Sequence, residues 1–216
     1  MKTNTIDARM LNAQVAIDNA LSNETIKVSL ALFGYDEARL NEGLALYEDA
    51  LTKHNKQKQE YGEQYEASDA LNAAMSNANS VYMRYVKIAR IALRGQRGAW
   101  QSLDLDGRRK QTYSGWIKQA SVFYANAQAN EPIRVALAKF GITEQALAEG
   151  LAGIKDVETK LAAQLKEKGE AQDATRIRDE AFEALQDWMS DFVAISRIAL
   201  EDQSQLLEVL GIVEPA

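Results

Sequence analysis

The sequence has no cysteine, two prolines and one histidine among 216 residues. Without cysteine, the chain cannot form a disulfide, a zinc–thiolate site, a cysteine-ligated iron–sulfur cluster or a thiol nucleophile. Proline breaks helix interiors, so its scarcity, together with abundant Ala, Leu, Glu, Gln and Lys, favours helix along the whole chain. Runs of alternating β-branched and aromatic residues are also missing, so we expect no sheet.

Long hydrophobic runs are missing as well. No apolar stretch approaches the roughly 18 residues that a membrane span needs. Met1 to Arg9 are polar and lack the apolar centre of a secretory signal. We therefore expect a cytoplasmic protein without a membrane span. The net charge of −6 argues against general nucleic-acid binding, which depends on neutralisation of phosphates by Lys and Arg.

Motifs that would mark a catalytic or cofactor site are absent from the sequence. The single histidine, His54, stands at helical spacing from Tyr47 and Leu51, so we interpret it as a partly buried helix residue. The Glu-x-x-His pairs of di-iron bundles and the glycine-rich phosphate-binding signatures do not occur. No metal, cofactor or catalytic residue is therefore predicted.

What the chain does contain is an internal repeat at an offset of 107 residues. Asn23-Glu24 then aligns with Asn130-Glu131, and Phe33-Gly34 aligns with Phe140-Gly141. Roughly 35 of about 95 aligned positions are identical without a gap, which is typical of a tandem duplication.

Each copy is predicted to contain four helices. Asn23 and Asn130 are natural N-caps of a short second helix, which Gly34 and Gly141 end. Two long helices with apolar residues at alternating spacings of three and four follow, separated by a predicted polar turn at 66–69 and again at 173–176. We therefore predict an all-α fold.

The predicted organisation is two tandem four-helix-bundle-like units that pack together with pseudo-twofold symmetry. The first unit covers residues 1–94 and the second 115–216. A linker at 95–114 is expected to contain a short helix. The linker's basic residues lie among aromatic ones; in an acidic chain we interpret it as a connector rather than a clamp for single-stranded nucleic acid.

Two sets of residues are candidates for a site. A cluster of aromatic residues could line an apolar pocket between the halves: Tyr85, Trp116, Phe123, Tyr124 and Trp188. Charged residues shared by the copies could form structural ion pairs across the predicted hairpins, Glu42 with Arg90 and Glu149 with Arg197.

Three classes of function remain open at this point. The preferred one is a non-catalytic interaction or scaffold protein that docks a protein partner, or a second copy of itself, through its helix faces. The alternatives are a protein that binds a small molecule or lipid between the halves, and an enzyme without a recognisable motif.

Overall fold

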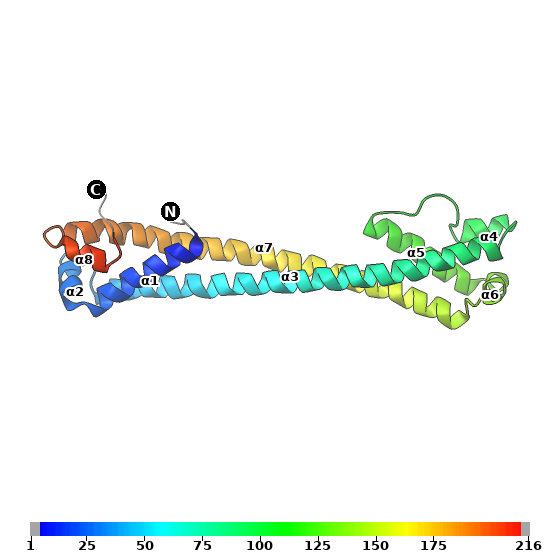
Figure 1. The fold of residues 1–216 in the computed structure, drawn as a ribbon, viewed down its shortest axis with the longest axis horizontal. Coiled ribbons are helices and arrows are strands. Elements are labelled where there is room, and N and C mark those ends of the chain that lie inside the picture. The colour runs from blue at the N-terminus through cyan, green and yellow to red at the C-terminus, as the bar shows by residue number, and fades with distance from the viewer. Residues whose placement is uncertain (1–4, 213–216) are drawn as a thin grey trace. The chain divides into compact units, whose positions relative to one another are not determined.

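The computed structural model describes residues 5–212, which form helices joined by turns and short non-helical segments and contain no strand, so the all-α prediction is confirmed (Figure 1). Residues 1–4, part of the segment in which no secretory signal was expected, lie outside it. None of the described helices combines the length and apolarity needed to cross a membrane. The helices are α1 (Ile6–Ser22), α2 (Glu24–Ala31), α3 (Glu37–Ala92), α4 (Arg97–Ser102), α5 (Tyr113–Ala129), α6 (Glu131–Ala138), α7 (Glu144–Ala199) and α8 (Ser204–Val209). Every bound in the first four recurs 107 positions later in the last four.

The short helices begin and end where the sequence predicts. The side chain of Asn23 accepts hydrogen bonds from the first turn of α2, and that of Asn130 does so in α6. Gly34 and Gly141 have φ angles of +85° and +80°, the left-handed conformation that lets the chain leave the helix.

The predicted turns at 66–69 and 173–176 are wrong, because α3 and α7 are each continuous over 56 residues. The stretch that contains Gly62 and leads to the first of these positions is polar. It is rich in Glu, Gln, Lys and Ala, which are strong helix formers, and contains no proline. One glycine costs a helix only about 1 kcal/mol, which is too little to end it.

The chain forms two compact units that do not follow the predicted boundaries 1–94 and 115–216. Unit 1 consists of Met1–Tyr61 and Glu170–Ala216, and unit 2 of Gly62–Gly169. Each unit therefore combines one part of α3 with one part of α7. Unit 1 adds α1, α2 and α8, whereas unit 2 adds α4, α5 and α6 (Figure 1).

The core of unit 2 is built around tyrosine, phenylalanine and tryptophan side chains. Tyr82 from α3 makes edge-to-face contacts with Trp116 and Phe123 from α5, with ring centroids 6.1 and 5.6 Å apart. Apolar residues of the first part of α7, among them Leu147 and Ile154, complete this core. The backbone of α7 comes close to α5 at Gly150, where no side chain separates it from the ring of Tyr124.

The core of unit 1 has the same kind of close approach. Trp188 of α7 lies against Gly43 of α3 and stacks on Phe192, with ring centroids 5.1 Å apart. The buried face of α1, which includes Ile17, packs with the part of α7 around Leu185. Figure 1 shows α1 and this part of α7 running in the same direction, with α3 antiparallel to both.

Candidate functional site

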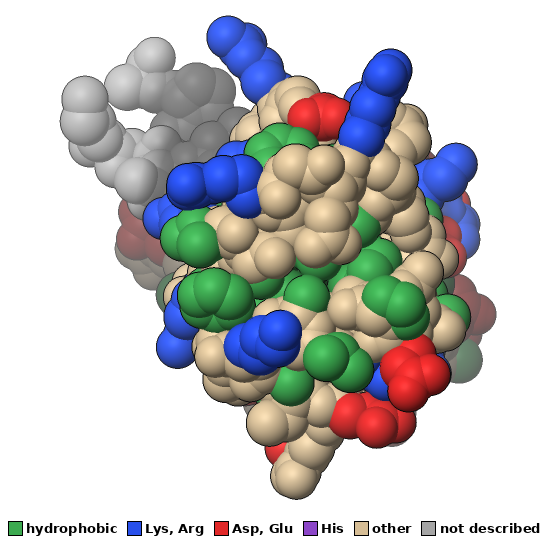
Figure 2. All heavy atoms as spheres, turned by 90° about the vertical axis from the view of Figure 1, so that its right-hand side faces the viewer, with side chains coloured by type: hydrophobic (Ala, Val, Ile, Leu, Met, Phe, Trp, Pro, Cys, Tyr) green, Lys and Arg blue, Asp and Glu red, His purple; other side chains and the backbone are tan. Residues whose placement is uncertain are grey.

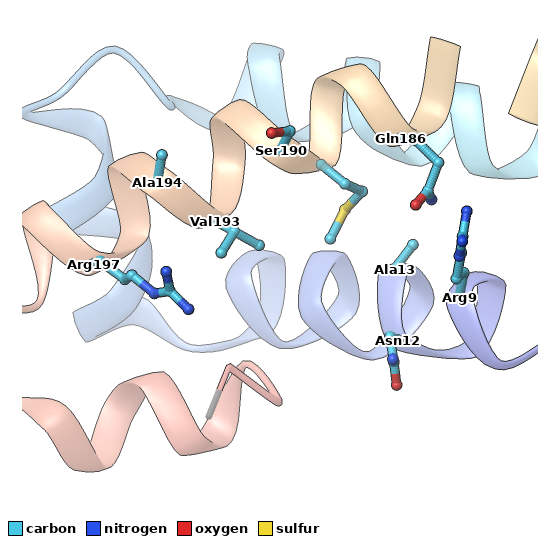
Figure 3. A pocket seen from close by; sticks show the side chains of 9 residues that line it. Arg9, Asn12, Ala13, Gln186, Ser190, Val193, Ala194 and Arg197 are labelled. Carbon is cyan, nitrogen blue, oxygen red and sulfur yellow. The ribbon is translucent and has the colours of Figure 1, made fainter. Parts of the chain in front are cut away.

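A groove of about 490 Å³ lies in unit 1 between α1 and the C-terminal part of α7 (Figure 3). This volume is within the range of about 300–1,000 Å³ that is typical of ligand sites. Its lining consists of Arg9, Asn12 and Ala13 from α1 and Gln186, Met189, Ser190, Val193, Ala194 and Arg197 from α7.

The spacing of the α7 residues explains why they share one face. Positions three, four and seven residues apart follow one another along the same side of a helix. The central residues Ala13, Ser190 and Ala194 have small side chains, which leaves space between the two helices. Figure 3 shows Arg9 near Gln186 at one end of the groove and Arg197 at the other. No acidic residue belongs to the lining.

The corresponding position in unit 2 is filled by larger side chains. Trp116 stands where unit 1 has Arg9, and Tyr82 stands where unit 1 has Met189. The indole Nε1 of Trp116 donates a hydrogen bond of 2.9 Å to Oδ1 of Asn79, the counterpart of Gln186. Both large rings are buried.

A non-helical segment of the chain itself, residues 103–112, is bound beside these side chains in unit 2. Arg90 donates from Nε and Nη2 to the carbonyl oxygen of Leu105, at 3.0 and 2.6 Å. Gln119 accepts from the backbone N–H of Lys110 at 3.1 Å and donates to Oδ2 of Asp104 at 2.6 Å. Side chains of α3 and α5 thus hold an irregular segment through its main chain and a carboxylate.

Arg109 of the same segment also reaches the core. Its Nη1 donates a 3.0 Å hydrogen bond to the hydroxyl of Tyr82. Burial raises the pKa of Tyr82, and the nearby guanidinium partly opposes that shift. Residues 103–112 are therefore attached to α3 and α5 at several points.

The two units share an equivalent hydrogen bond at the ends of their short helices α4 and α8. Asn126 donates to the carbonyl oxygen of Ser102 at 2.7 Å, and its counterpart Asn19 donates to that of Val209 at 2.6 Å. They differ at an arginine that both copies have: Arg197 forms no hydrogen bond or ion pair with another residue in 5–212, whereas its counterpart Arg90 donates to a carbonyl oxygen. Arg197 lines the groove instead.

The structure brings together four of the five predicted aromatic residues. Trp116, Phe123 and Tyr124 are buried in the core of unit 2, and the half-buried Tyr85 lies 6.3 Å from Tyr124 between ring centroids. Trp188 belongs to unit 1. The rings pack on one another, and burial raises the pKa of Tyr124 strongly.

The ion pair proposed between Glu42 and Arg90 required a turn between them, and α3 has none. Glu42 is exposed in unit 1, and Arg90 lies in unit 2, bound to a carbonyl. The same correction applies to the second pair, because Glu149 and Arg197 both lie on the continuous α7. Glu149 accepts a 2.9 Å hydrogen bond from Gln145, one turn away.

Exposed apolar residues recur at equivalent positions in the two units. Val135 and Phe140 of unit 2 are 53% and 51% exposed, and their counterparts Val28 and Phe33 in unit 1 are 55% and 45% exposed. Figure 2 shows the face of unit 2 that bears α4 and α6, where hydrophobic side chains lie among Lys and Arg side chains. These positions offer exposed apolar surface in both units.

Sequence reasoning missed the groove, although one signal was available. Position-by-position comparison of the repeats pairs Arg9 with Trp116 and Met189 with Tyr82, so one copy lacks two large rings that the other has. Comparison with family models, curated proteins and solved structures finds no match to this chain.

Proposed function

We propose that the protein is a non-catalytic helical docking protein that binds a non-helical segment of a partner protein in the groove between α1 and α7. One observation carries the proposal: at the equivalent place in unit 2, the same helix faces hold residues 103–112 of the chain itself. The helix faces there already suit a main-chain ligand, and among residues 5–212 only α1 and α7 line the groove of unit 1.

The docking proposal is favoured over an apolar small-molecule site at the aromatic cluster. In unit 2 the aromatic rings contact one another, so the space that such a ligand needs is occupied by side chains. The groove in unit 1 has charged and amide side chains along its length, which suit a main chain with its carbonyl and N–H groups.

The test is a selection of displayed random peptides on the intact protein, followed by measurement of the affinity of enriched peptides for two variants. Ala194→Trp places a large ring in the groove from an exposed position and should abolish binding. Ala184→Trp is the matched control, since Ala184 is also exposed on α7 but is not part of the groove lining. Peptides that bind Ala194→Trp as tightly as the unmodified protein, or the absence of any enriched peptide, contradict the proposal.

A further inference from the structure

The end faces of the two units carry opposite charge, and we propose that they bind each other in different copies of the chain. In this arrangement the acidic end face of unit 1 on one copy packs against the basic end face of unit 2 on the next. The end face of unit 1 consists of the exposed residues of 28–33 and 198–204, and that of unit 2 of the equivalent residues in 135–140 and 91–97. None of these residues lines the groove, so the proposal is separate from the docking function.

Two separate stretches of chain form each end face, and both are anchored in one core. Leu30 of α2 and Leu200, which follows α7, belong to the same core of unit 1. Leu137 of α6 and Leu93, which follows α3, belong to the same core of unit 2. The exposed residues beside these anchors therefore lie at the same end of their unit, as Figure 1 shows for each unit.

Exposed apolar side chains supply the contact surface of both end faces. Besides the two valines and two phenylalanines described above, Ile198 and its counterpart Ile91 are 51% and 55% exposed. Leu32 of unit 1 is 80% exposed, and Lys139 stands at its position in unit 2. Exposed apolar residues that gather among charged ones are typical of surfaces that bind another protein.

The charged residues of the two end faces have opposite signs. Arg94 and Arg97 lie at the junction of α3 and α4, whereas Glu201 and Asp202 lie at the equivalent junction of α7 and α8. All four residues are exposed, and none of them forms an ion pair within residues 5–212. Figure 2 shows Lys and Arg side chains among hydrophobic ones on the end face of unit 2, with acidic side chains toward one edge of the view. Each face therefore has charge that the other can neutralise.

The opposite charges select one pairing of the faces. Contact between two copies of the same face would bring like charges together, arginine against arginine or carboxylate against carboxylate, which costs free energy. The mixed pairing joins opposite charges while it covers the apolar residues of both faces. Exposed ion pairs contribute little affinity, so we expect the apolar residues to supply most of it and the charges to choose the partner face. Because the two faces differ, each added copy leaves a face for another, and copies assemble into rings or open chains.

The first measurement is the mass of the full chain in solution by sedimentation equilibrium, over a range of concentrations and at low and moderate salt. We expect a weight-average mass of 24.0 kDa in dilute solution that rises with concentration. The rise should be smaller at moderate salt, because salt screens the exposed charges. A mass that stays at 24.0 kDa at every concentration overturns the proposal.

Two single substitutions test which faces meet. Phe140→Glu places a negative charge on the end face of unit 2, and Phe33→Arg places a positive charge on the end face of unit 1. Each variant alone has only one usable face and should remain a monomer. An equimolar mixture should form a species of about twice 24.0 kDa, because the intact unit 1 face of one variant meets the intact unit 2 face of the other. A variant that self-associates as strongly as the unmodified protein, or a mixture that does not associate, overturns the pairing.

Further variants keep the test independent of the two phenylalanines. Arg94→Glu combined with Arg97→Glu changes only exposed residues and should also give a monomer, since both end faces are then acidic. Leu11→Arg is the matched control for Phe33→Arg, because Leu11 is an exposed apolar residue of unit 1 on α1, outside the end face. This control should self-associate like the unmodified protein. The proposal is overturned if the double arginine variant associates as strongly as the unmodified protein, or if Leu11→Arg abolishes association.

Discussion

Substitution of Gly150 by alanine is expected to destabilise unit 2, although the same change usually stabilises a helix interior. A Cβ atom at this position lies 2.2 Å from Cε1 of Tyr124 and 2.7 Å from its hydroxyl oxygen. Carbon atoms in favourable contact are about 3.5–4.0 Å apart, so the ring must move by more than about 1 Å. Tyr124 is fully buried among three other aromatic rings, so there is no free space to accept that movement.

Two opposing contributions set the magnitude. Alanine is favoured over glycine in a helix interior by about 1 kcal/mol. Overfilling a well-packed core costs about 1–3 kcal/mol, and a ring fixed on all sides belongs in the upper part of that range. We therefore expect Gly150→Ala to lower the free energy of unfolding by about 1–2 kcal/mol.

Gly169 provides the matched control, because it lies on the same helix and in the same unit. No atom lies within 4 Å of a Cβ built there, so Gly169→Ala should raise stability by about 0.5–1 kcal/mol. Urea-induced unfolding followed by helical circular dichroism gives both values. If Gly150→Ala stabilises the protein as much as Gly169→Ala does, the close approach of α7 to Tyr124 is not real.

Three further predictions follow from side chains of unit 2. Arg90→Gln should lower the free energy of unfolding by about 1.5–3 kcal/mol, because the hydrogen bonds from a half-buried charged donor to the carbonyl oxygen of Leu105 are lost. Arg197→Gln should change the free energy of unfolding by no more than about 0.5 kcal/mol. Urea unfolding of both variants checks this. Tyr124→Phe should be neutral or stabilising by up to about 1 kcal/mol, because the buried hydroxyl of Tyr124 has no hydrogen-bond partner among residues 5–212. Tyr82→Phe should destabilise the protein by about 1 kcal/mol, because the hydrogen bond from Arg109 is lost. Thermal unfolding of the two variants tests this prediction, and equal losses of stability would contradict it. Burial raises the pKa of Tyr124 above the ordinary tyrosine value of 10.0. The resulting stability is fully present below pH 10 and falls as the pH rises above 10, because the tyrosine of the unfolded chain ionises first. The urea midpoint, measured up to about pH 11, should therefore fall less in Tyr124→Phe than in the unmodified protein.

The ends of the short helices could be predicted because each is determined by local chemistry. An asparagine cap such as Asn130 and a left-handed glycine such as Gly141 act within a few residues of the chain. The continuity of α3 through Gly62 could not be predicted in the same way. The stretch is rich in strong helix formers, but a polar stretch with a glycine is also typical of a turn, so composition alone does not separate the two.

The groove depends on contacts between distant parts of the sequence. Arg9 and Gln186 lie on different helices, and nothing in the local sequence of either predicts that they share one surface. The aromatic cluster was predicted better, because large apolar residues at helical spacing have few places to go except the core. The sequence does not show how these rings pack, so it could not tell a pocket from a filled core. In the structure the rings themselves fill the space that a ligand would need.

Unit 1 is assembled from two separate segments of the chain, and this affects the order in which the units can fold during synthesis. Its two segments, Met1–Tyr61 and Glu170–Ala216, are separated by the whole of unit 2, whereas unit 2 is a single stretch of chain. On the ribosome, α1 and α2 are made before unit 2, yet they have no C-terminal part of α7 to pack on until residues beyond 170 have been synthesised. The entropy lost in closing a loop of about a hundred residues also falls once that loop has become ordered. Unit 2 can therefore fold before unit 1, and α1 and α2 find their partners only afterwards, although they are translated earlier than unit 2.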